Sequence, residues 1–442
     1  MAAKQFHRTV RYAMFGVFAG ASALFVTPML AQPGGGAREK QGTWWKFTTL
    51  GFKFEGADTC GGSNCHGGGN TNFPPEKEGS PGSQYNIWQA NDKHANAAKQ
   101  VSAPELDKHP WMKDIGSKLG ISGPLLSDAK CVSCHATQVP DNLKGAKYNV
   151  SEGVTCYHCH GPSEKWGKPH AEKGWTQKMR DSKPHDALLK EWGLYDTKSV
   201  MHRAEMCASC HLSIDASLVK AGHPQPIFEQ VTFQTNEPQH WVDPTGYYVS
   251  KLWAAGQVIA LRDAMTQLAT RATGGAEEAY VKQAYDQATT HLAMVDAILA
   301  AKLIDGDKAA LDAAAKSLAD KPDAAAAASV AKIAETLATK INDAQPDKAK
   351  TLAVLNAVAG NADLVTKHGR RAAEQQYYAL YNLYAAAYAS AEGVGEADYK
   401  VIDDLLLPLG EQVPLEDKTK EVDAAKFTAD LAKAATALKA LK

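Results

Sequence analysis

Neither sign of charge is in excess in this 442-residue chain, which has 48 lysines and arginines against 49 aspartates and glutamates, a formal net charge of −1. The chain therefore lacks the strongly basic balance with which nucleic-acid binders neutralise phosphates, and we expect no nucleic-acid partner. After the N-terminal region it has no apolar run of about 18 or more residues, which excludes a multi-span membrane protein. Cysteine and tryptophan are absent after Trp253, so all eight cysteines and all nine tryptophans lie at or before it.

Residues 1–31 have the pattern of a secretory signal peptide. Lys4, Arg8 and Arg11 precede an apolar stretch, and Ala31 offers a small residue for cleavage. An uncleaved anchor is the alternative, because the stretch is close to membrane-spanning length. In either case we expect the body of the protein to be exported, to the periplasm or beyond it, and to associate with a membrane only if the leader stays attached. Residues 32–55 begin with a glycine-rich run and are predicted to be a linker.

All eight cysteines fall in pairs that are followed at once by histidine. The pairs are Cys60 and Cys65 before His66, Cys131 and Cys134 before His135, Cys156 and Cys159 before His160, and Cys207 and Cys210 before His211. Disulfides or zinc sites also use paired cysteines, but neither requires histidine directly after the second one. With 15 histidines in 442 residues, the chance that histidine follows all four pairs at random is on the order of one in a million, whereas the pattern for haem attachment requires it. The motifs indicate four covalently attached c-type haems, each with an iron.

The spacing within each motif follows from haem chemistry. Each thiol forms a thioether with one vinyl group of the porphyrin, and the adjacent histidine ligates the iron. Two residues separate the cysteines in the last three motifs, whereas residues 61–64 separate Cys60 from Cys65. We expect this longer, glycine-containing loop to bulge outward without moving its two ends. A disulfide between Cys60 and Cys65 is the alternative for this pair.

Further histidines are dense in the haem-bearing stretch and could supply second axial ligands. They are His94, His109, His158, His170, His185, His202, His223 and His240. Bis-histidine ligation leaves no open position on iron and favours electron transfer over bond chemistry. Methionines such as Met112 and Met206 are alternative ligands, although methionine is more often a packing residue. His291 and His368 lie outside this stretch and are expected to be ordinary structural histidines.

The stretch from Gly56 to Trp241 resembles the multihaem cytochromes of the cytochrome c-554 type, which are tetrahaem carriers that accept electrons from hydroxylamine-oxidising enzymes. The resemblance lies in residues 56–60, 65–68, Trp88, 93–95, 153–156, 160–162, Trp166, His170, 203–204, 221–224 and 238–241. It implies that His94, His170, His223 and His240 are the distal ligands, without saying which serves which haem. The family has catalytic and filament-forming members, so the resemblance alone does not determine function.

Composition divides the chain into two predicted domains and a mainly α fold. Residues 56–245 are expected to form a loop-rich tetrahaem domain with short helices, because four haems must supply much of its core. Residues 246–442 are rich in alanine and leucine, with apolar residues at helical spacing. Glycines and prolines mark turns at 274–275, Gly306, Pro322, Pro346, Gly360 and Pro408. We therefore predict an antiparallel bundle of about five to seven helices.

One tyrosine stripe in the second domain has two interpretations. Tyr377, Tyr381, Tyr384 and Tyr388 share a helical face, and bundle packing is favoured over a docking surface for the haem domain or a partner.

The favoured function is an exported tetrahaem carrier that exchanges electrons with a donor and an acceptor protein. No acid–base pair can be identified, so no catalytic residue is predicted and an electron-transfer protein is favoured over an enzyme. Two alternatives stay open: an enzyme that acts on a small nitrogen oxide at a five-coordinate haem, and a subunit of an extracellular conducting filament, which would make the protein a homo-oligomer.

Overall fold

The computed structural model describes residues 45–68, 82–172, 182–238, 240–241, 243–389, 396–414 and 421–439. The predicted signal peptide lies outside the described residues, as do residues 32–44 of the predicted linker. The described part is mainly α-helical, as predicted, and its β pairing is limited to an isolated parallel bridge between Phe54 and Lys144. Within the same residues, no helix combines the length and the apolar character needed to cross a bilayer.

The N-terminal unit consists of short helices joined by loops, as expected for a domain that carries the cysteine motifs. Its α-helices are α2 (Trp45–Thr48), α3 (Gln84–Asn91), α4 (Ala103–Lys108), α5 (Pro110–Lys118), α6 (Ala129–His135), α7 (Cys156–His160), α9 (His185–Trp192), α10 (Val200–His211), α11 (Ala216–Ala221) and α12 (Gln230–Asn236). Its 3-10 helices are η1 (Ala57–Thr59), η2 (Lys93–Val101), η3 (Leu125–Ser127), η4 (Asp141–Leu143), η5 (Val150–Glu152) and η6 (Pro169–Ala171).

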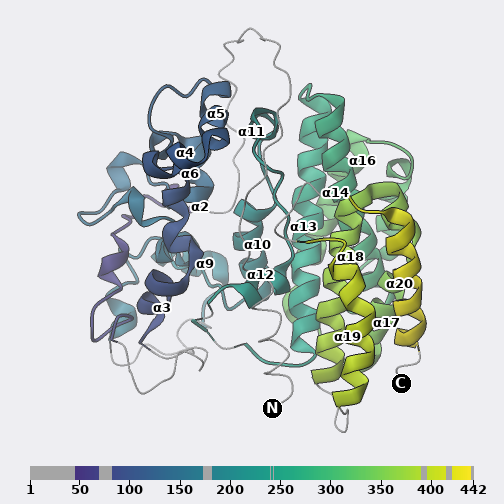
Figure 1. Cartoon of the computed structure of the whole chain (residues 1–442). Coiled ribbons are helices and arrows are strands. Elements are labelled where there is room, and N and C mark those ends of the chain that lie inside the picture. The colour runs from purple at the N-terminus through teal and green to yellow at the C-terminus, as the bar shows by residue number, and fades with distance from the viewer. Residues whose placement is uncertain are drawn as a thin grey trace.

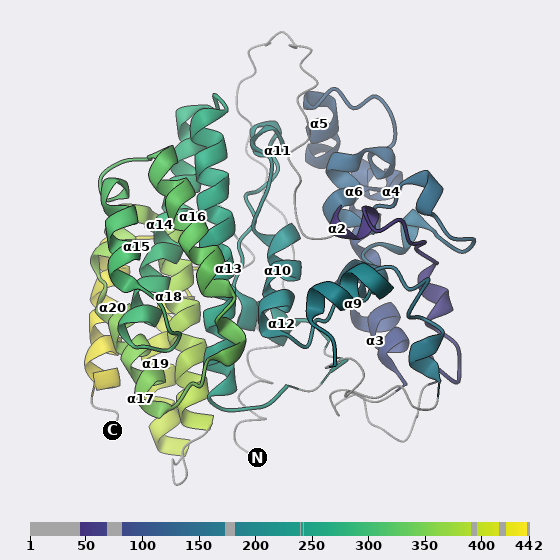
Figure 2. The same ribbon diagram turned by 180° about the vertical axis from the view of Figure 1, so that it is seen from behind.

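The C-terminal unit is a bundle of longer helices. They are α13 (Tyr248–Thr273), α14 (Glu278–Ala300), α15 (Lys308–Ala315), α16 (Ala324–Ala338), α17 (Lys348–Gly360), α18 (Asp363–Ala389), α19 (Glu396–Gly410) and α20 (Ala424–Lys439), with 3-10 turns at η7 (Lys316–Leu318) and η8 (Ile341–Asp343). Figure 1 shows the two units side by side, and Figure 2 shows from behind that α10, α11 and α12 lie between α13 and the remaining N-terminal helices.

Most helix boundaries in the bundle lie where glycine, proline and capping residues predict them. Gly275 has a φ of 72° after α13, a conformation that residues with a Cβ rarely adopt. Asp323 accepts hydrogen bonds from the amides of Ala325 and Ala326 at 3.0 Å and starts α16. The turn expected at Pro408 is wrong by two residues, since Pro408 lies inside α19. Because proline has no N–H, Pro408 cannot donate to the carbonyl of Asp404, and the last turn of α19 has one helical hydrogen bond fewer.

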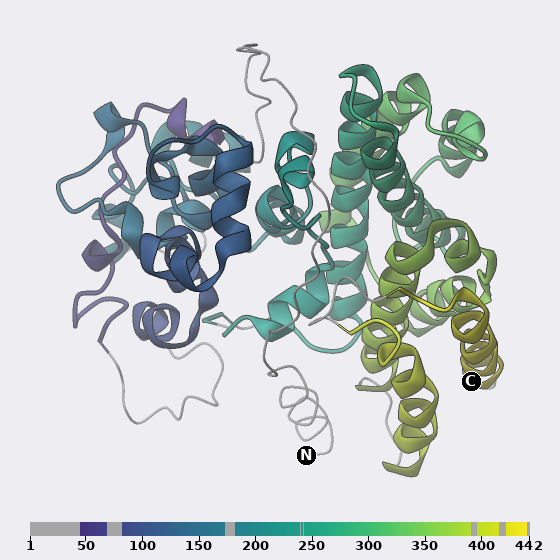
Figure 3. The same cartoon turned by 45° about the horizontal axis from the view of Figure 1, so that its top comes forward.

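The main hydrophobic core crosses the predicted domain boundary. Val200, Ala204 and Ala208 recur every four residues along one face of α10. Together with Leu212, which follows the helix, they belong to the same buried cluster as Trp253 and the apolar residues of α13 to α20. Figure 3 shows α10 and α12 against the long helix α13. The helix that carries the last cysteine motif is therefore packed directly on the bundle.

The rest of the N-terminal unit has only small hydrophobic clusters between its cysteine motifs. One joins Phe47 and Phe54 with Tyr157 and Tyr195, so residues 45–55 of the predicted linker pack into this unit. The ring centroids of Phe47 and Tyr195 lie 5.4 Å apart in an edge-to-face contact. Two further clusters of three or four buried residues lie around Ile115 and Ala98. Small, separate clusters are what a domain shows when bound groups complete its core.

The tyrosine stripe of α18 takes part in bundle packing. Tyr384 is buried in the main cluster, and Tyr377 and Tyr381 are partly buried against it. The ring of Tyr377 packs so closely on Gly410 of α19 that a Cβ at Gly410 would meet it at 2.7 Å. The packing interpretation is confirmed for these three tyrosines, while the side chain of Tyr388 lies outside the described residues.

Candidate haem sites

Three of the four cysteine motifs have the same local structure, a helical turn that ends on the histidine. Residues 131–135 end α6, residues 156–160 form α7, and residues 207–211 end α10. In a helix, residues three and four apart share one face, so both cysteines and the histidine point to the same side. Gly161 ends α7 with a φ of 77°, and a Cβ there would overlap the carbonyl of Gly193.

The first motif is a compact loop that brings its two cysteines back together. The amide of Cys65 donates to the carbonyl of Gly62 at 2.8 Å, and the amide of His66 donates to the carbonyl of Cys60 at 3.1 Å. The four intervening residues are therefore taken up in a turn between fixed ends. All eight cysteines are free thiols in this structure, including Cys60 and Cys65, for which a disulfide was the alternative.

Three of the predicted distal histidines lie opposite three of the motif histidines. Ring centroids are 6.0 Å apart for His66 and His170, 6.1 Å for His94 and His211, and 6.4 Å for His135 and His223. An imidazole nitrogen bonds a metal at about 2.0 Å and lies roughly 1.1 Å from its ring centre, so two imidazoles on opposite sides of one metal have centres about 6.2 Å apart. The three separations match bis-histidine ligation of one iron each. Sequence resemblance indicated the distal set but not this pairing.

Hydrogen bonds at Nδ1 orient most of these rings. The Nδ1 contacts are His66 with Gln84 Oε1 at 2.9 Å, His94 with Asp92 Oδ1 at 3.1 Å, His135 with the carbonyl of Ala97 at 3.4 Å, His170 with the carbonyl of Trp166 at 3.2 Å and His223 with the carbonyl of Pro224 at 2.7 Å. Because each partner is an oxygen acceptor, Nδ1 carries the proton and Nε2 is left as the ligating nitrogen. This is the tautomer that an axial ligand needs.

His160 and His240 are the motif histidine and the predicted distal histidine that remain after these three pairs. The ring of His240 lies edge-on against Trp241, with centroids 5.0 Å apart. Burial lowers the pKa of His240, and the Asp92 carboxylate partly offsets this. Asp92 also acts on Cys159 of the His160 motif, whose thiol pKa burial raises well above its usual value. His240 and the third motif therefore share Asp92 as a neighbour.

An acidic pair lies at the His94 ring. Asp92 is buried, and Glu237 Oε1 lies 4.0 Å from His94 Nδ1. Burial raises the pKa of Glu237 to about 7, and His94 acts in the opposite direction. Burial also raises the pKa of Asp92, but its hydrogen bonds with His94 outweigh this and leave it lowered. A carboxylate at the second nitrogen of a ligating histidine makes the ligand more basic and fixes its orientation.

The cysteine thiols are poor candidates for a zinc site. The group of side chains that could hold an ion among the described residues consists of Asp92, His94 and Glu237, and it contains no cysteine. The residues thus fit thioether attachment to haem better than metal binding by sulfur.

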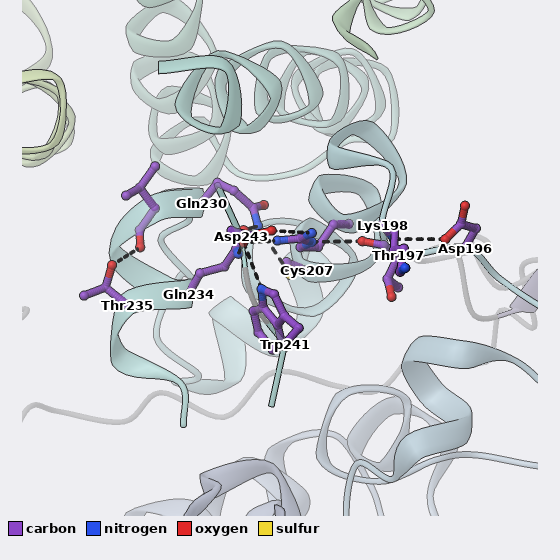
Figure 4. Close-up of polar contacts among 11 residues, drawn as sticks. Asp196, Thr197, Lys198, Cys207, Gln230, Gln234, Thr235, Trp241 and Asp243 are labelled. Carbon is purple, nitrogen blue, oxygen red and sulfur yellow. Dashed lines mark hydrogen bonds and ion pairs between the residues drawn. The ribbon is translucent and has the colours of Figure 1, made fainter. Parts of the chain in front are cut away.

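Sequence reasoning missed a buried clasp beside the fourth motif. Arg203 of α10 makes a bidentate ion pair with Asp243, at 2.6 and 3.1 Å, and its Nε donates to the carbonyl of Thr197 at 2.9 Å. Two further groups donate to the Asp243 carboxylate, Trp241 Nε1 at 2.8 Å and Gln234 Nε2 at 3.3 Å. Figure 4 shows these side chains meeting at the carboxylate. The clasp ties the segment of His240 to the helix of Cys207. Nothing in the sequence marks Asp243, which lies 40 residues from Arg203.

The histidines that were left to a structural role have one in the bundle. His291 is fully buried, and its Nδ1 lies 2.8 Å from Gln257 Oε1. His368 Nδ1 lies 3.1 Å from Asp286 Oδ1. Neither belongs to a candidate haem site.

Comparison with known proteins supports the N-terminal sites. Residues 60–161 match the family described as cytochrome c554 and c-prime. This segment contains three of the four motifs and His94, and the resemblance stated above is confirmed over it. The match supports a c-type cytochrome segment, a class of protein in which haem is bound covalently. Searches of curated proteins and of solved structures found no match to the chain.

Proposed function

We propose that the chain is an exported tetrahaem c-type cytochrome that carries electrons between a donor and an acceptor protein. The observation that carries this proposal is the set of three histidine pairs at 6.0 to 6.4 Å, each joining a motif histidine to a predicted distal histidine. Two protein ligands on an iron leave no position for a substrate, so the arrangement supports electron transfer. Bound haem supplies reversible one-electron chemistry at its iron.

The eight cysteines would hold the four haems, and eight histidines would ligate them. His66 pairs with His170, His135 with His223 and His211 with His94 in this proposal. His240 is assigned to the motif of His160, supported by their common neighbour Asp92.

Contacts between cysteines of different motifs support an order for the four sites. Cys60 and Cys156 shift each other's thiol pKa, as do Cys134 and Cys210, so the side chains of each pair lie close together. Cys159 also interacts electrostatically with Cys207. The attachment points therefore follow the order first, third, fourth and second motif. Neighbouring attachment points favour short electron steps along this series.

The haem content tests whether the chain binds four haems, and substitution of the distal histidines tests whether these residues ligate iron. Protein purified from a host that matures c-type cytochromes should have an intact mass with four haems, and Cys60→Ala with Cys65→Ala should remove one. An unchanged haem content in that double variant would contradict the first site.

His94→Ala, His170→Ala and His223→Ala should each open one iron to carbon monoxide in the reduced protein. His109→Ala is the matched control, because His109 lies in the same unit but its Nε2 pairs with Glu105 at 3.1 Å. It should leave the spectrum unchanged. If the three variants behave like this control, the proposed ligation is wrong.

A further inference from the structure

The bundle contacts the chain segment that follows His223. This ligand segment, residues 223–229, links α11 to α12 and lies against α14 and α18. Gln225 is buried within it, and its Nε2 donates to the carbonyl of Leu212 at 3.2 Å and to Gln287 Oε1 of α14 at 3.1 Å. Leu212 follows directly on the motif histidine His211. Gln225 therefore connects the ligand segment both to the haem motif of His211 and to the bundle.

Two arginines of the bundle donate to Gln225, the buried Arg271 to its side chain and the partly buried Arg371 to its backbone. Arg271 Nη2 of α13 donates to Gln225 Oε1 at 2.9 Å. Arg371 Nη2 of α18 donates to the backbone carbonyl of Gln225 at 3.0 Å. Hydrogen bonds from charged donors inside a protein are stronger than neutral ones, and a buried acceptor that loses its donor is costly.

α18 continues these contacts along the segment. Gln375 Nε2 donates to the carbonyl of Phe228 at 3.0 Å, and Asn382 Nδ2 donates to Glu229 Oε2 at 2.9 Å. Arg371, Gln375 and Asn382 are four and seven residues apart, so they form one face of the helix. This polar face of α18 forms hydrogen bonds with the ligand segment of the haem-bearing unit.

The chain between Gln225 and the ring of His223 has little conformational freedom. Gly222 ends α11 with a φ of 112°, the amide of His223 donates to the carbonyl of Leu218 at 2.9 Å, and Pro224 has a fixed φ. The His223 ring also bonds the Pro224 carbonyl through Nδ1. A displacement of Gln225 therefore moves the ring relative to His135, from which its centroid lies 6.4 Å.

We propose that Arg271 and Arg371 are positioning residues for the axial ligand His223, and that the helical bundle acts as a rigid support for this haem site. The inference rests on the proposed role of His223. It gives the bundle a function in axial ligation, although no residue of the bundle is itself a predicted ligand.

Arg370 provides a matched control for Arg371. Both arginines belong to α18 and both pair with Glu374, at 2.6 and 3.3 Å. Arg370 Nη2 donates to the carbonyl of Pro414 inside the bundle at 2.7 Å, whereas Arg371 reaches Gln225. Loss of either removes a bond to Glu374, but only loss of Arg371 releases the ligand segment.

The experiment compares Arg371→Met, Arg371→Lys and Arg370→Met in the haem-loaded full chain. Carbon monoxide binding to the reduced protein and the low-spin spectrum of the oxidised protein report on the His223 site, and thermal unfolding reports on stability separately. Loss of a group that hydrogen-bonds a ligand directly typically costs 10- to 100-fold. Because Arg371 acts through Gln225, Arg371→Met should raise carbon monoxide affinity at one haem by up to about 10-fold. Arg371→Lys keeps a donor and should restore much of the wild-type behaviour, and Arg370→Met should match wild type.

Equal spectra and equal carbon monoxide binding for Arg371→Met and Arg370→Met would overturn the inference. If Arg371→Met does not fold, Gln225→Met, which removes the acceptor of Arg271, carries the same expectation and the same refutation. The variant His223→Ala distinguishes an error in the assignment of His223 as a ligand from an error in the positioning role of the arginines. If this variant opens no carbon monoxide site, the ligand assignment in the proposed function is wrong; if it opens one while Arg371→Met does not, only the positioning role is wrong.

Discussion

Replacement of Arg203 by methionine should destabilise the protein strongly, because it leaves the Asp243 carboxylate buried without its main partner. The side chains of Arg203 and Asp243 are only 10% and 16% exposed, and two hydrogen bonds join them. Removing one partner of a buried ion pair costs about 3 to 5 kcal/mol. Urea unfolding followed by tryptophan fluorescence should show this loss in the free energy of unfolding. The His240 segment should loosen at the same time, which carbon monoxide binding would detect.

Two comparisons make this prediction specific. Lys220→Met removes an ion pair with Glu277 in which both side chains are more than half exposed, and it should cause no measurable loss. Adding Asp243→Leu to Arg203→Met removes the stranded carboxylate and should recover part of the stability. If Arg203→Met is as stable as Lys220→Met, the clasp does not stabilise the fold and the reasoning fails.

Three further predictions concern the bundle, an axial ligand and a close backbone approach. Burial lowers the pKa of His291 to about 3, so the unfolded chain binds a proton at this imidazole more tightly than the folded chain does. The free energy of unfolding should therefore fall as the pH drops from about 6.5 toward 3, by about 2 kcal/mol at pH 5. His291→Leu should flatten this pH dependence in urea titrations. Gln84→Leu removes the oxygen bonded to His66 Nδ1 and should raise carbon monoxide affinity at one haem by roughly 10- to 100-fold, and an unchanged spectrum would count against His66 as a ligand. Gly56→Ala would overlap a main-chain carbonyl and should lower the free energy of unfolding by about 1 to 3 kcal/mol, whereas Gly123→Ala, with no atom within 4 Å of its Cβ, should cost little.

Local features of the candidate sites were predictable from sequence, whereas their partners were not. The attachment motifs need residues at fixed short spacing, and helical turns at Cys131, Cys156 and Cys207 follow from that spacing. The pairing of His94 with His211 joins residues more than a hundred positions apart, so only the folded chain reveals it. The same is true of the clasp between Arg203 and Asp243.

In the bundle, too, the helix ends were predictable from nearby residues, whereas contacts between distant segments were not. Glycine and proline turns placed most helix ends, because these residues restrict the backbone wherever they occur. The eight α-helices of the described part exceed the expected number, since a short helix such as α15 leaves a weak periodic signal. Composition predicted a division after residue 245, but Ala204 and Ala208 place α10 in the core of the bundle. Small residues at a four-residue spacing are the signal that would have indicated this contact.

Carbon monoxide binding to the fully reduced, haem-loaded protein tests the central claim most directly. If every iron has two protein ligands, the visible spectrum of the dithionite-reduced protein should be unchanged when carbon monoxide is added. A shift in the fraction that corresponds to one or more haems would contradict bis-histidine ligation throughout, and would identify an iron at which small molecules bind.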